Sequence, residues 1–374
     1  MSPYLFLLCM DVLARRLYDQ SLDPKSGLGI KLAPTAPRIP CLFFADDSLI
    51  ICKTSVQACR QLKSLLDVFC AQSGQSINFH KSSLIFSKNA CASDKQTVAG
   101  IFNIPHSAAI GKYLGCPIFM GRPNADHFQP LIAKVLSKLD NWKANCFSKA
   151  GRVVLIQSHL ESLPSHTMQC FKLPRSVSDK LDQISREFFW KTSCNSKGLP
   201  LIAWDTICRP KKMDGLGLRK TAAVNLAFIA KLAWKFLTKP DNFWVQLMSL
   251  KYSSPDQFFH CKMRPSDSWV WKCLLRTRSF LNQGLRWKVG NGKTISFWTD
   301  VWCTEESLGS KINLDLVPSN AVGLKVCDLI TIDKHWDEVK LNQILPADLV
   351  QAVKEIPIPS TDVSDSFCWA HRKR

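Results

Sequence analysis

Two short apolar runs flank a pair of adjacent aspartates near the start of the chain. The runs cover residues 41–44 and 49–52, and Asp46 and Asp47 lie between them. Apolar runs of this length on both sides of a polar turn predict a β-hairpin with two carboxylates at its tip. Like charges at such a tip repel each other unless a cation neutralises them, and hard divalent ions prefer carboxylate oxygens. The pattern leaves two interpretations open, a metal site for phosphoryl transfer and an ordinary solvated Asp-Asp turn.

Helical patterns precede and follow this hairpin. A helix is expected over residues 2–19, with Pro3 at its first position. Thr54 or Ser55 is expected to cap a second helix, whose apolar positions recur at helical spacing until Gly74 ends it. Short strands are expected at residues 29–32, 77–79 and 84–86.

From about residue 125 the pattern becomes helical and basic. Helices are expected over residues 127–147, 148–163, 176–191, 225–237 and 268–281, followed by a hairpin of residues 285–289 with 294–298 and by helices near Leu341 and over 346–355. The glycine-rich turn of that hairpin is too short for a phosphate-binding loop, which excludes a nucleoside-triphosphate motif there. Basic residues recur on polar positions of the first two helices: Lys134, Lys138, Lys143, Lys149 and Arg152. They either follow a nucleic-acid backbone or form a solvated charged face.

Charge is concentrated in the middle of the chain. The 374 residues carry a formal net charge of +19, and residues 121–300 hold 29 Lys and Arg against 12 Asp and Glu. This local excess favours a polyanionic partner, most simply nucleic acid. Nine of the 12 tryptophans lie in the same region, where burial in cores is favoured over stacking on bases.

The 16 cysteines are scattered singly, without a C-x-x-C pair. This distribution is typical of reduced thiols in an intracellular protein rather than of a disulfide scaffold. The apolar run at residues 4–10 has no basic flank before it, and no apolar run approaches the ~20 residues of a membrane span. We therefore expect a protein that is not secreted and has no membrane partner.

Four motifs occur in a characteristic order: Ser-Pro-Tyr-Leu-Phe at 2–6, Phe-Ala-Asp-Asp at 44–47, the segment 73–83, and Gly-Lys-Tyr-Leu-Gly at 111–115. Together they resemble the later palm motifs of reverse transcriptases of the LINE, or non-LTR retrotransposon, type. Further motifs resemble the region that follows the polymerase in plant elements of this kind: Phe-Lys-Leu-Pro at 171–174, Ala-Trp-Asp at 203–205, Cys-Arg-Pro-Lys at 208–211 and Gly-Leu-Gly-Leu-Arg at 215–219. The resemblance extends to about Trp302.

The resemblance implies a set of functional residues. Asp46 and Asp47 would be catalytic ligands of Mg²⁺ or Mn²⁺, and Lys81 would act as an acid toward the pyrophosphate leaving group. The residues expected to contact nucleic acid are Phe44, Ala45, Lys112, Tyr113, Leu114, Gly115, Lys143, Lys149 and Arg152. The implied partners are an RNA template and a DNA primer, and the implied location is the nucleus.

The expected fold is α+β. A partial polymerase palm would occupy residues 1–120, a helical thumb 121–192, a basic Trp-rich connector 193–302, and an acidic segment 303–374 that ends before a zinc-binding module. The small hairpin at 285–298 would lie in the connector. The turn-rich run 192–200 is the expected boundary after the thumb.

The resemblance begins part-way through the family's palm, so we expect an N-terminally truncated reverse transcriptase without the first catalytic aspartate motif and the fingers. Two-metal catalysis needs carboxylates from separate strands. We therefore expect no polymerase activity from this chain alone, unless a second polypeptide supplies the missing half. The alternatives are a non-catalytic nucleic-acid-binding remnant, and a chain without selected function that folds poorly.

Overall fold

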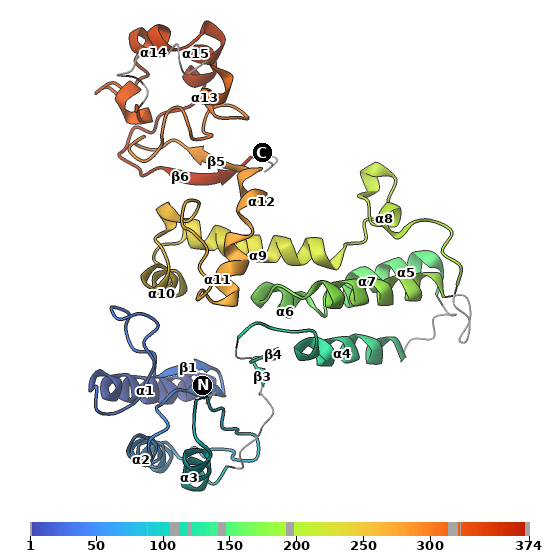
Figure 1. Ribbon diagram of the computed structural model, residues 1–374, viewed down its shortest axis with the longest axis vertical. Helices are drawn as coiled ribbons and strands as arrows, with labels where there is room; N and C mark the ends of the chain where they lie inside the picture. The colour runs from blue at the N-terminus through green and yellow to red at the C-terminus, as the bar shows by residue number, and fades with distance from the viewer. Residues whose placement is uncertain are drawn as a thin grey trace. The chain divides into compact units, whose positions relative to one another are not determined.

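The computed structural model describes most of the chain, in two compact units. The described residues are 2–87, 89–104, 112–118, 121–140, 147–191, 198–312, 321 and 323–370. One unit comprises Met1–Ile229 and Asp241–Cys273, and the other comprises Ala230–Pro240 and Leu274–Arg374. Helices predominate, and the named strands form three two-stranded antiparallel sheets (Figure 1). The predicted α+β class is confirmed.

The first hydrophobic cluster belongs to the N-terminal elements. These are α1 (Ser2–Leu22), β1 (Cys41–Phe44), β2 (Asp47–Ile50), α2 (Val56–Ser73) and α3 (Ala92–Phe102). Leu17 of α1 and Phe102 of α3 are buried in it. The side chain of Ser55 accepts the Ala58 N–H and caps α2, and Gly74 ends that helix with a φ of 70°. Both ends of α2 therefore lie where the sequence predicts them.

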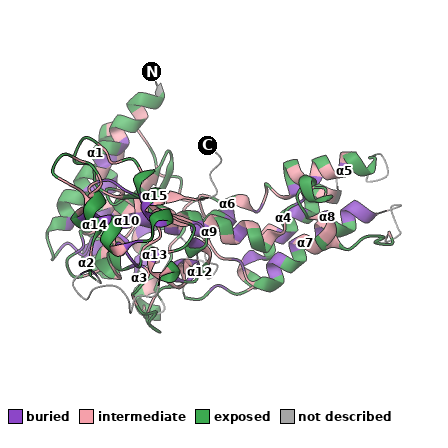
Figure 2. Cartoon of the chain, turned by 90° about the horizontal axis from the view of Figure 1, so that it is seen from above, coloured by how far each residue is buried: buried purple, intermediate pink, exposed green. Residues whose placement is uncertain are grey.

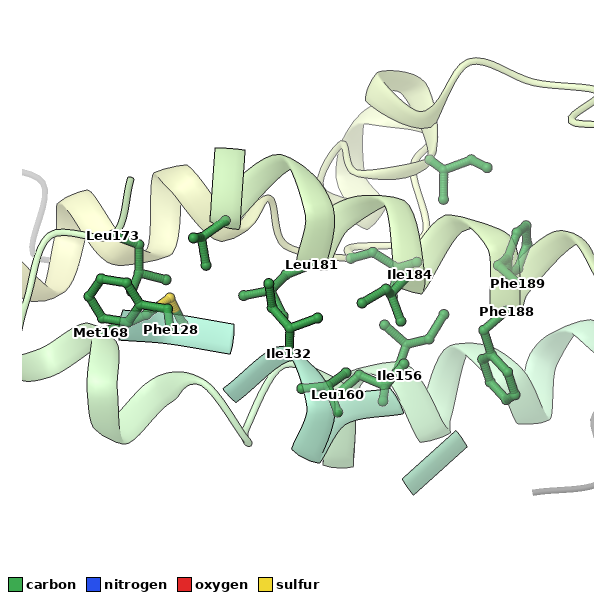
Figure 3. Packing of buried hydrophobic residues seen from close by; sticks show 14 of the residues in the cluster. Phe128, Ile132, Ile156, Leu160, Met168, Leu173, Leu181, Ile184, Phe188 and Phe189 are labelled. Atoms are coloured by element: carbon green, nitrogen blue, oxygen red, sulfur yellow. The ribbon is translucent and has the colours of Figure 1, made fainter. Parts of the chain in front are cut away.

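A second cluster is formed by the helices of the middle region. Its surroundings contain β3 (Lys112–Tyr113), β4 (Cys116–Pro117), η1 (Asp126–Phe128), α4 (Gln129–Asp140), α5 (Lys149–Leu155), the π-helical turn η3 (Ile156–Leu160), α6 (Ser165–Cys170), α7 (Arg175–Trp190), α8 (Trp204–Ile207) and η4 (Lys211–Met213). Buried positions recur along α7 at helical spacing (Figure 2). Leu181 and Ile184 of α7 pack in the same cluster as Ile132, Ile156 and Leu160 (Figure 3).

Polar side chains attach the next helix, α9 (Thr221–Thr238), to this cluster. The carboxylate of Asp182 on α7 accepts hydrogen bonds from the N–H and hydroxyl of Thr221, at 2.9 and 2.6 Å. The buried Asn225 amide donates to the Met168 and Phe171 carbonyls and accepts the Leu173 N–H. The elements that complete this unit are α10 (Phe243–Lys251), η5 (Pro255–Gln257) and α11 (Trp269–Leu275). Because the polar groups of Asn225 are paired, its burial is compatible with a stable core.

The second unit has its own hydrophobic core. Its elements are α12 (Arg278–Asn282), β5 (Leu285–Lys288), α13 (Leu308–Lys311), η7 (Val326–Leu329), α14 (Glu338–Ile344), α15 (Ala347–Lys354) and β6 (Ser366–Trp369). The indole N–H of Trp298 donates to the Ala321 carbonyl, and that of Trp302 donates to the Phe297 carbonyl. These tryptophans are core residues, as the sequence favours. The two helices expected near the C-terminus are confirmed by α14 and α15.

The partner of β5 differs from the prediction. β5 pairs with β6, in the register Leu285↔Trp369, and not with residues 294–298. The expected hairpin turn instead surrounds a carboxylate, because Asp365 accepts the N–H groups of Gly290, Gly292 and Thr294 at 2.7–2.9 Å. The chain segment before β6 is thereby held against this loop, which leaves β5 beside β6.

Four further predictions of local structure are wrong. Residues 29–32, 77–79 and 84–86 form no strand, and Ile30 has only an isolated bridge to Ile39. At 77–79 the reason is local, since Asn78 accepts the Lys81 N–H with both its side chain and its carbonyl and so forms a turn. The helix expected over 268–281 is split into α11 and α12, where the buried Thr277 hydroxyl donates to the Leu274 carbonyl.

The carboxylate of Asp365 should stabilise the second unit. Burial alone would raise the pKa of Asp365, but hydrogen bonds from Thr294, Gly290 and Gly292 outweigh this and keep the pKa below its ordinary value. We expect Asp365→Asn to reduce the free energy of unfolding by about 1–2 kcal/mol at neutral pH. The wild-type advantage should be lost as the pH falls through the folded-state pKa, which urea unfolding at several pH values measures. Asp362→Asn is the control, because among the described residues the Asp362 side chain forms only an exposed 3.8 Å pair with Lys293. Equal losses in both variants would contradict this role.

Candidate metal and nucleic-acid site

The acidic hairpin has a tight two-residue turn. Phe44 pairs with Asp47, so Ala45 and Asp46 form the turn and Asp47 already begins β2. The turn is thus shorter than the four residues that separate the two apolar runs. Ala45 has a φ of 51°, in the left-handed region that a residue with a side chain rarely adopts. Strained backbone of this kind concentrates at functional sites, and here it lies next to the two carboxylates.

Both carboxylates face solvent. Within the described part of the chain, neither Asp46 nor Asp47 forms an ion pair or a side-chain hydrogen bond. Phe44, which lies opposite Asp47 in the register, is 64% exposed. A large apolar ring and two uncompensated negative charges therefore share the tip of one hairpin. That combination can attract a divalent cation and place a flat apolar ring beside it.

A second hairpin lies against the first. β3 and β4 are joined by Leu114 and Gly115, whose φ angles of 50° and 76° form a tight turn. The hydroxyl of Tyr113 donates to the Leu42 carbonyl at 3.2 Å. Burial raises the pKa of the Tyr113 phenol, and the negative charge of Asp47 raises it further. Tyr113 and Leu42, which are 71 positions apart in the sequence, thus meet beside the acidic pair. Because the acceptor is a backbone carbonyl, the residue type at position 42 does not indicate this contact.

Lys81 lies outside this contact. Its N–H belongs to the turn formed by Asn78, and its side chain is exposed. Among the described residues, no hydrogen bond or ion pair connects Lys81 with Asp46 or Asp47. The predicted role of Lys81 as an acid therefore stays a prediction.

Arg152 and Lys149 interact with the C-terminal end of α7. Arg152 is only 6% exposed, and its guanidinium donates to the Phe188, Phe189 and Lys191 carbonyls. The Lys149 ammonium donates to the Phe189 carbonyl at 2.7 Å and lies over the Phe189 and Trp190 rings. Burial and the neighbouring Arg152 charge lower the pKa of Lys149. Cations at a helix C-terminus satisfy its unpaired carbonyls and oppose its dipole.

Two exposed basic residues of this region lie on α4, and others lie on α7. Lys134 and Lys138 are one turn apart and exposed. Lys143, which the sequence also assigns to a nucleic-acid interface, lies outside the described residues. Lys112 is exposed at the start of β3. Within the described part of the chain, Lys112, Lys134 and Lys138 have no side-chain hydrogen bond or ion pair, so they can contact a phosphate backbone without giving one up.

Other features of the described chain give no additional metal site. Among the described residues, no three His, Cys, Asp or Glu side chains are grouped so that they could hold a metal ion. A cleft of about 630 Å³ lies between α7 and the start of α9, and charges of both signs line it, including Arg175, Asp182 and Lys220. No helix in the described part is long and apolar enough to cross a membrane.

Comparison with known proteins relates the acidic hairpin to polymerases. Residues 1–118 match the reverse transcriptase (RNA-dependent DNA polymerase) family model. The matched segment contains both hairpins of the candidate site. It also contains Lys81.

Two proteins of Arabidopsis thaliana are similar to this chain. One is named "Putative ribonuclease H protein", and it is 31% identical over 229 residues, which are 60% of this chain and 37% of that protein. The other is an uncharacterized mitochondrial protein, 28% identical over 147 residues, which are 39% of this chain and 96% of that protein. The chain thus spans little more than a third of the first relative. These findings support a function related to reverse transcription.

The left-handed backbone at Ala45 should tolerate only small residues. We expect Ala45→Val to lower the free energy of unfolding of the unit by about 1–2 kcal/mol, because a β-branched side chain opposes positive φ. Ala45→Gly should be close to neutral, since the relief of strain offsets the added freedom of the unfolded chain. Urea unfolding followed by circular dichroism compares the two variants. An Ala45→Val protein as stable as Ala45→Gly would show that this turn is not strained.

The internal role of Arg152 can be separated from that of Lys149. We expect Arg152→Met to cost about 2–4 kcal/mol, because three carbonyls at the end of α7 lose a buried charged donor. Lys149→Met should cost less than about 1.5 kcal/mol, because its ammonium is largely exposed and contributes one hydrogen bond. Chemical denaturation measures both. Comparable losses would mean that burial does not distinguish the two cations.

Proposed function

We propose that this chain is part of a reverse transcriptase of the LINE, or non-LTR retrotransposon, type. The observation that carries the proposal is the contact between the two hairpins of the segment that matches the family model. Tyr113 donates to Leu42, and the charge of Asp47 acts on the Tyr113 phenol. The hairpin whose residues are expected to contact nucleic acid thus lies beside the carboxylates expected to hold metal.

The two carboxylates have different proposed roles. Asp46, in the turn, is the proposed ligand of a catalytic Mg²⁺ or Mn²⁺ ion. In addition to burial, the negative charge of Asp47 raises the pKa of the Tyr113 phenol, which supports a role of Asp47 toward a second ion or the primer end. The ions would lower the barrier by activating the primer 3′-oxygen and stabilising the leaving oxygen. Lys81 is the proposed acid for the pyrophosphate.

The proposed nucleic-acid contacts come from both clusters of this unit. Phe44 and Ala45 would face the primer end or incoming nucleotide, and residues 112–115 would hold the primer. Lys134 and Lys138 on α4 would contact the phosphates of an RNA template and DNA primer, and Lys143 and Lys149 are proposed as further contacts. Arg152 is not part of the proposed interface, because its buried guanidinium donates hydrogen bonds to carbonyls at the end of α7. Phosphate contacts of this kind are independent of base sequence and sensitive to salt.

Polymerisation by these residues alone is not part of the proposal. Asp46 and Asp47 are adjacent, whereas two-metal transfer requires carboxylates that converge from separate strands. We propose that the pair binds Mg²⁺ weakly and that activity depends on a further palm strand and fingers, supplied by additional sequence or by a second polypeptide. A nuclear location is expected with this function.

The alternative is a non-catalytic nucleic-acid-binding protein. The excess of basic residues between 121 and 300 favours it, because binding to phosphates needs no metal ligands. The two functions make different demands on Asp46 and Asp47. Only the polymerase needs them, so extension that depends on the pair would exclude the alternative, whereas binding without the pair is expected of both functions.

Primer extension and binding should be measured on the same protein. With a poly(rA)–oligo(dT) duplex and Mg²⁺ or Mn²⁺, we expect no extension by the chain alone. The variant carrying Asp46→Asn and Asp47→Asn should bind the duplex at least as tightly as wild type, because two negative charges are removed. Extension by wild type and not by this variant would show that a complete site assembles, and would overturn the proposed dependence on further sequence.

A second pair of variants tests the interface. Lys134→Gln with Lys138→Gln should reduce the slope of log affinity against log salt by about two, one for each lost phosphate contact. Lys340→Gln with Lys354→Gln removes the same charge from helices of the other unit, where both lysines form exposed ion pairs. Equal changes in both pairs would mean that only net charge matters and that α4 is not the interface.

A further inference from the structure

Two cysteines and a histidine meet where the second hairpin lies against α6. Cys116 is in β4, and Cys170 is the last residue of α6. Their sulfur atoms are 3.8 Å apart. His166 lies one helical turn before Cys170, and its Nδ1 is 3.4 Å from the Cys116 sulfur. The first cysteine is separated from the other two residues by about fifty positions, so the sequence contains no sign of the cluster.

The two thiols differ in their access to solvent. Cys170 is exposed and Cys116 is partly buried, and neither of them forms a disulfide. A disulfide has an S–S length of about 2.05 Å, so the two sulfur atoms need to approach by less than 2 Å. Rotation of side chains on neighbouring elements can supply such a movement. The pair is therefore poised for a disulfide without rearrangement of the fold.

We propose that Cys116 and Cys170 form a reversible disulfide when the protein meets a peroxide, with His166 as the base. The role is independent of polymerase chemistry and does not rest on the function proposed above.

The reaction proceeds in two balanced steps. The exposed Cys170 thiol attacks hydrogen peroxide, gives a sulfenic acid and releases one water. The Cys116 sulfur then attacks the Cys170 sulfur, and the S–O bond breaks. His166 Nδ1 takes the Cys116 proton and delivers it to the leaving hydroxide, which departs as a second water. Two thiols are oxidised by two electrons, and the peroxide is reduced. A small-molecule thiol restores both cysteines by exchange.

The order of the steps follows from the surroundings of the two sulfurs. Burial raises the pKa of Cys116 to about 12, and the neighbouring Cys170 contributes in the same direction. Cys116 is thus a poor first nucleophile, since the thiolate is the reactive form. A base within reach of its proton removes this obstacle in the second step, provided that His166 has its proton on Nε2.

The disulfide would connect two parts of the unit that have separate hydrophobic clusters. Tyr113 of the same hairpin already donates to Leu42 beside the acidic turn. Cys116 would bind the hairpin covalently to α6, which lies in the cluster of α7. Oxidation should therefore restrict the motion of residues 112–117, which carry the predicted primer contacts.

The experiment uses the full chain treated with graded hydrogen peroxide, then alkylated, digested and analysed by mass spectrometry. We expect a peptide pair linked through Cys116 and Cys170 to form before any other linked pair and to disappear on reduction. In Cys116→Ser, Cys170 should remain as a sulfenic acid that a 1,3-dione reagent traps. Hydrogen exchange of residues 112–117 should slow on oxidation of the wild type only.

Two further variants test the cluster. His166→Asn keeps a polar side chain but removes the base, and it should slow disulfide formation about tenfold or more without changing the trapping rate at Cys170. Cys91→Ser removes an exposed thiol at the start of α3 and should leave the rate of disulfide formation unchanged. Circular dichroism verifies that each variant folds. Absence of the linked pair, its formation no earlier than other pairs, or a wild-type rate in His166→Asn would overturn the proposal.

Discussion

Two like charges on adjacent residues constrain the first third of the molecule. Asp46 and Asp47 cannot enter an apolar core, because burial of one charge without a partner costs several kcal/mol. The hairpin therefore turns within two residues and leaves both carboxylates in solvent, while Cys41 and Phe43 alternate with exposed positions and pack toward α1 and α2. The left-handed backbone at Ala45 is part of the same solution, since it closes the turn without a longer polar loop. The second hairpin then contacts β1 through the Tyr113 hydroxyl, which donates to the Leu42 carbonyl.

The second unit treats a carboxylate in the opposite way. Asp365 is held by three backbone N–H groups and a hydroxyl, and this cradle takes the place of a cation. The Asp365 carboxylate is engaged in hydrogen bonds within the protein, and these bonds fix the chain before β6. The contrast explains why the two acidic sites differ in their expected ability to bind a metal ion. A carboxylate whose oxygens already accept hydrogen bonds from the protein has few positions left for a metal ion, whereas the oxygens of Asp46 and Asp47 remain available.

Local signals account for what the sequence predicts correctly. α2 is bounded by its own cap at Ser55 and by Gly74, and the acidic hairpin follows from two apolar runs around a turn. The errors arise where distant residues decide. Leu285 pairs with Trp369 because the loop after β5 donates hydrogen bonds to the carboxylate of Asp365, which lies just before β6. The sequence around residue 290 does not indicate this contact. In the candidate site, the resemblance to reverse transcriptase motifs implies Asp47 and Tyr113, but their proximity depends on a backbone acceptor at Leu42.

Charge counting has the same limit. The basic excess between residues 121 and 300 indicates a polyanion, but it does not distinguish cations that face solvent from cations that the fold uses. Arg152 ends α7, and Lys149 lies over two aromatic rings at the same helix end, so neither offers a phosphate its full set of donors. Lys134 and Lys138 have no such internal partner in the described chain. A phosphate binds most favourably to a cation that has no hydrogen bond within the protein, because the energy of a displaced internal hydrogen bond is subtracted from that of binding. We therefore expect nucleic-acid affinity to depend more on exposed lysines without an internal partner, such as Lys134 and Lys138 of α4, than on the total charge.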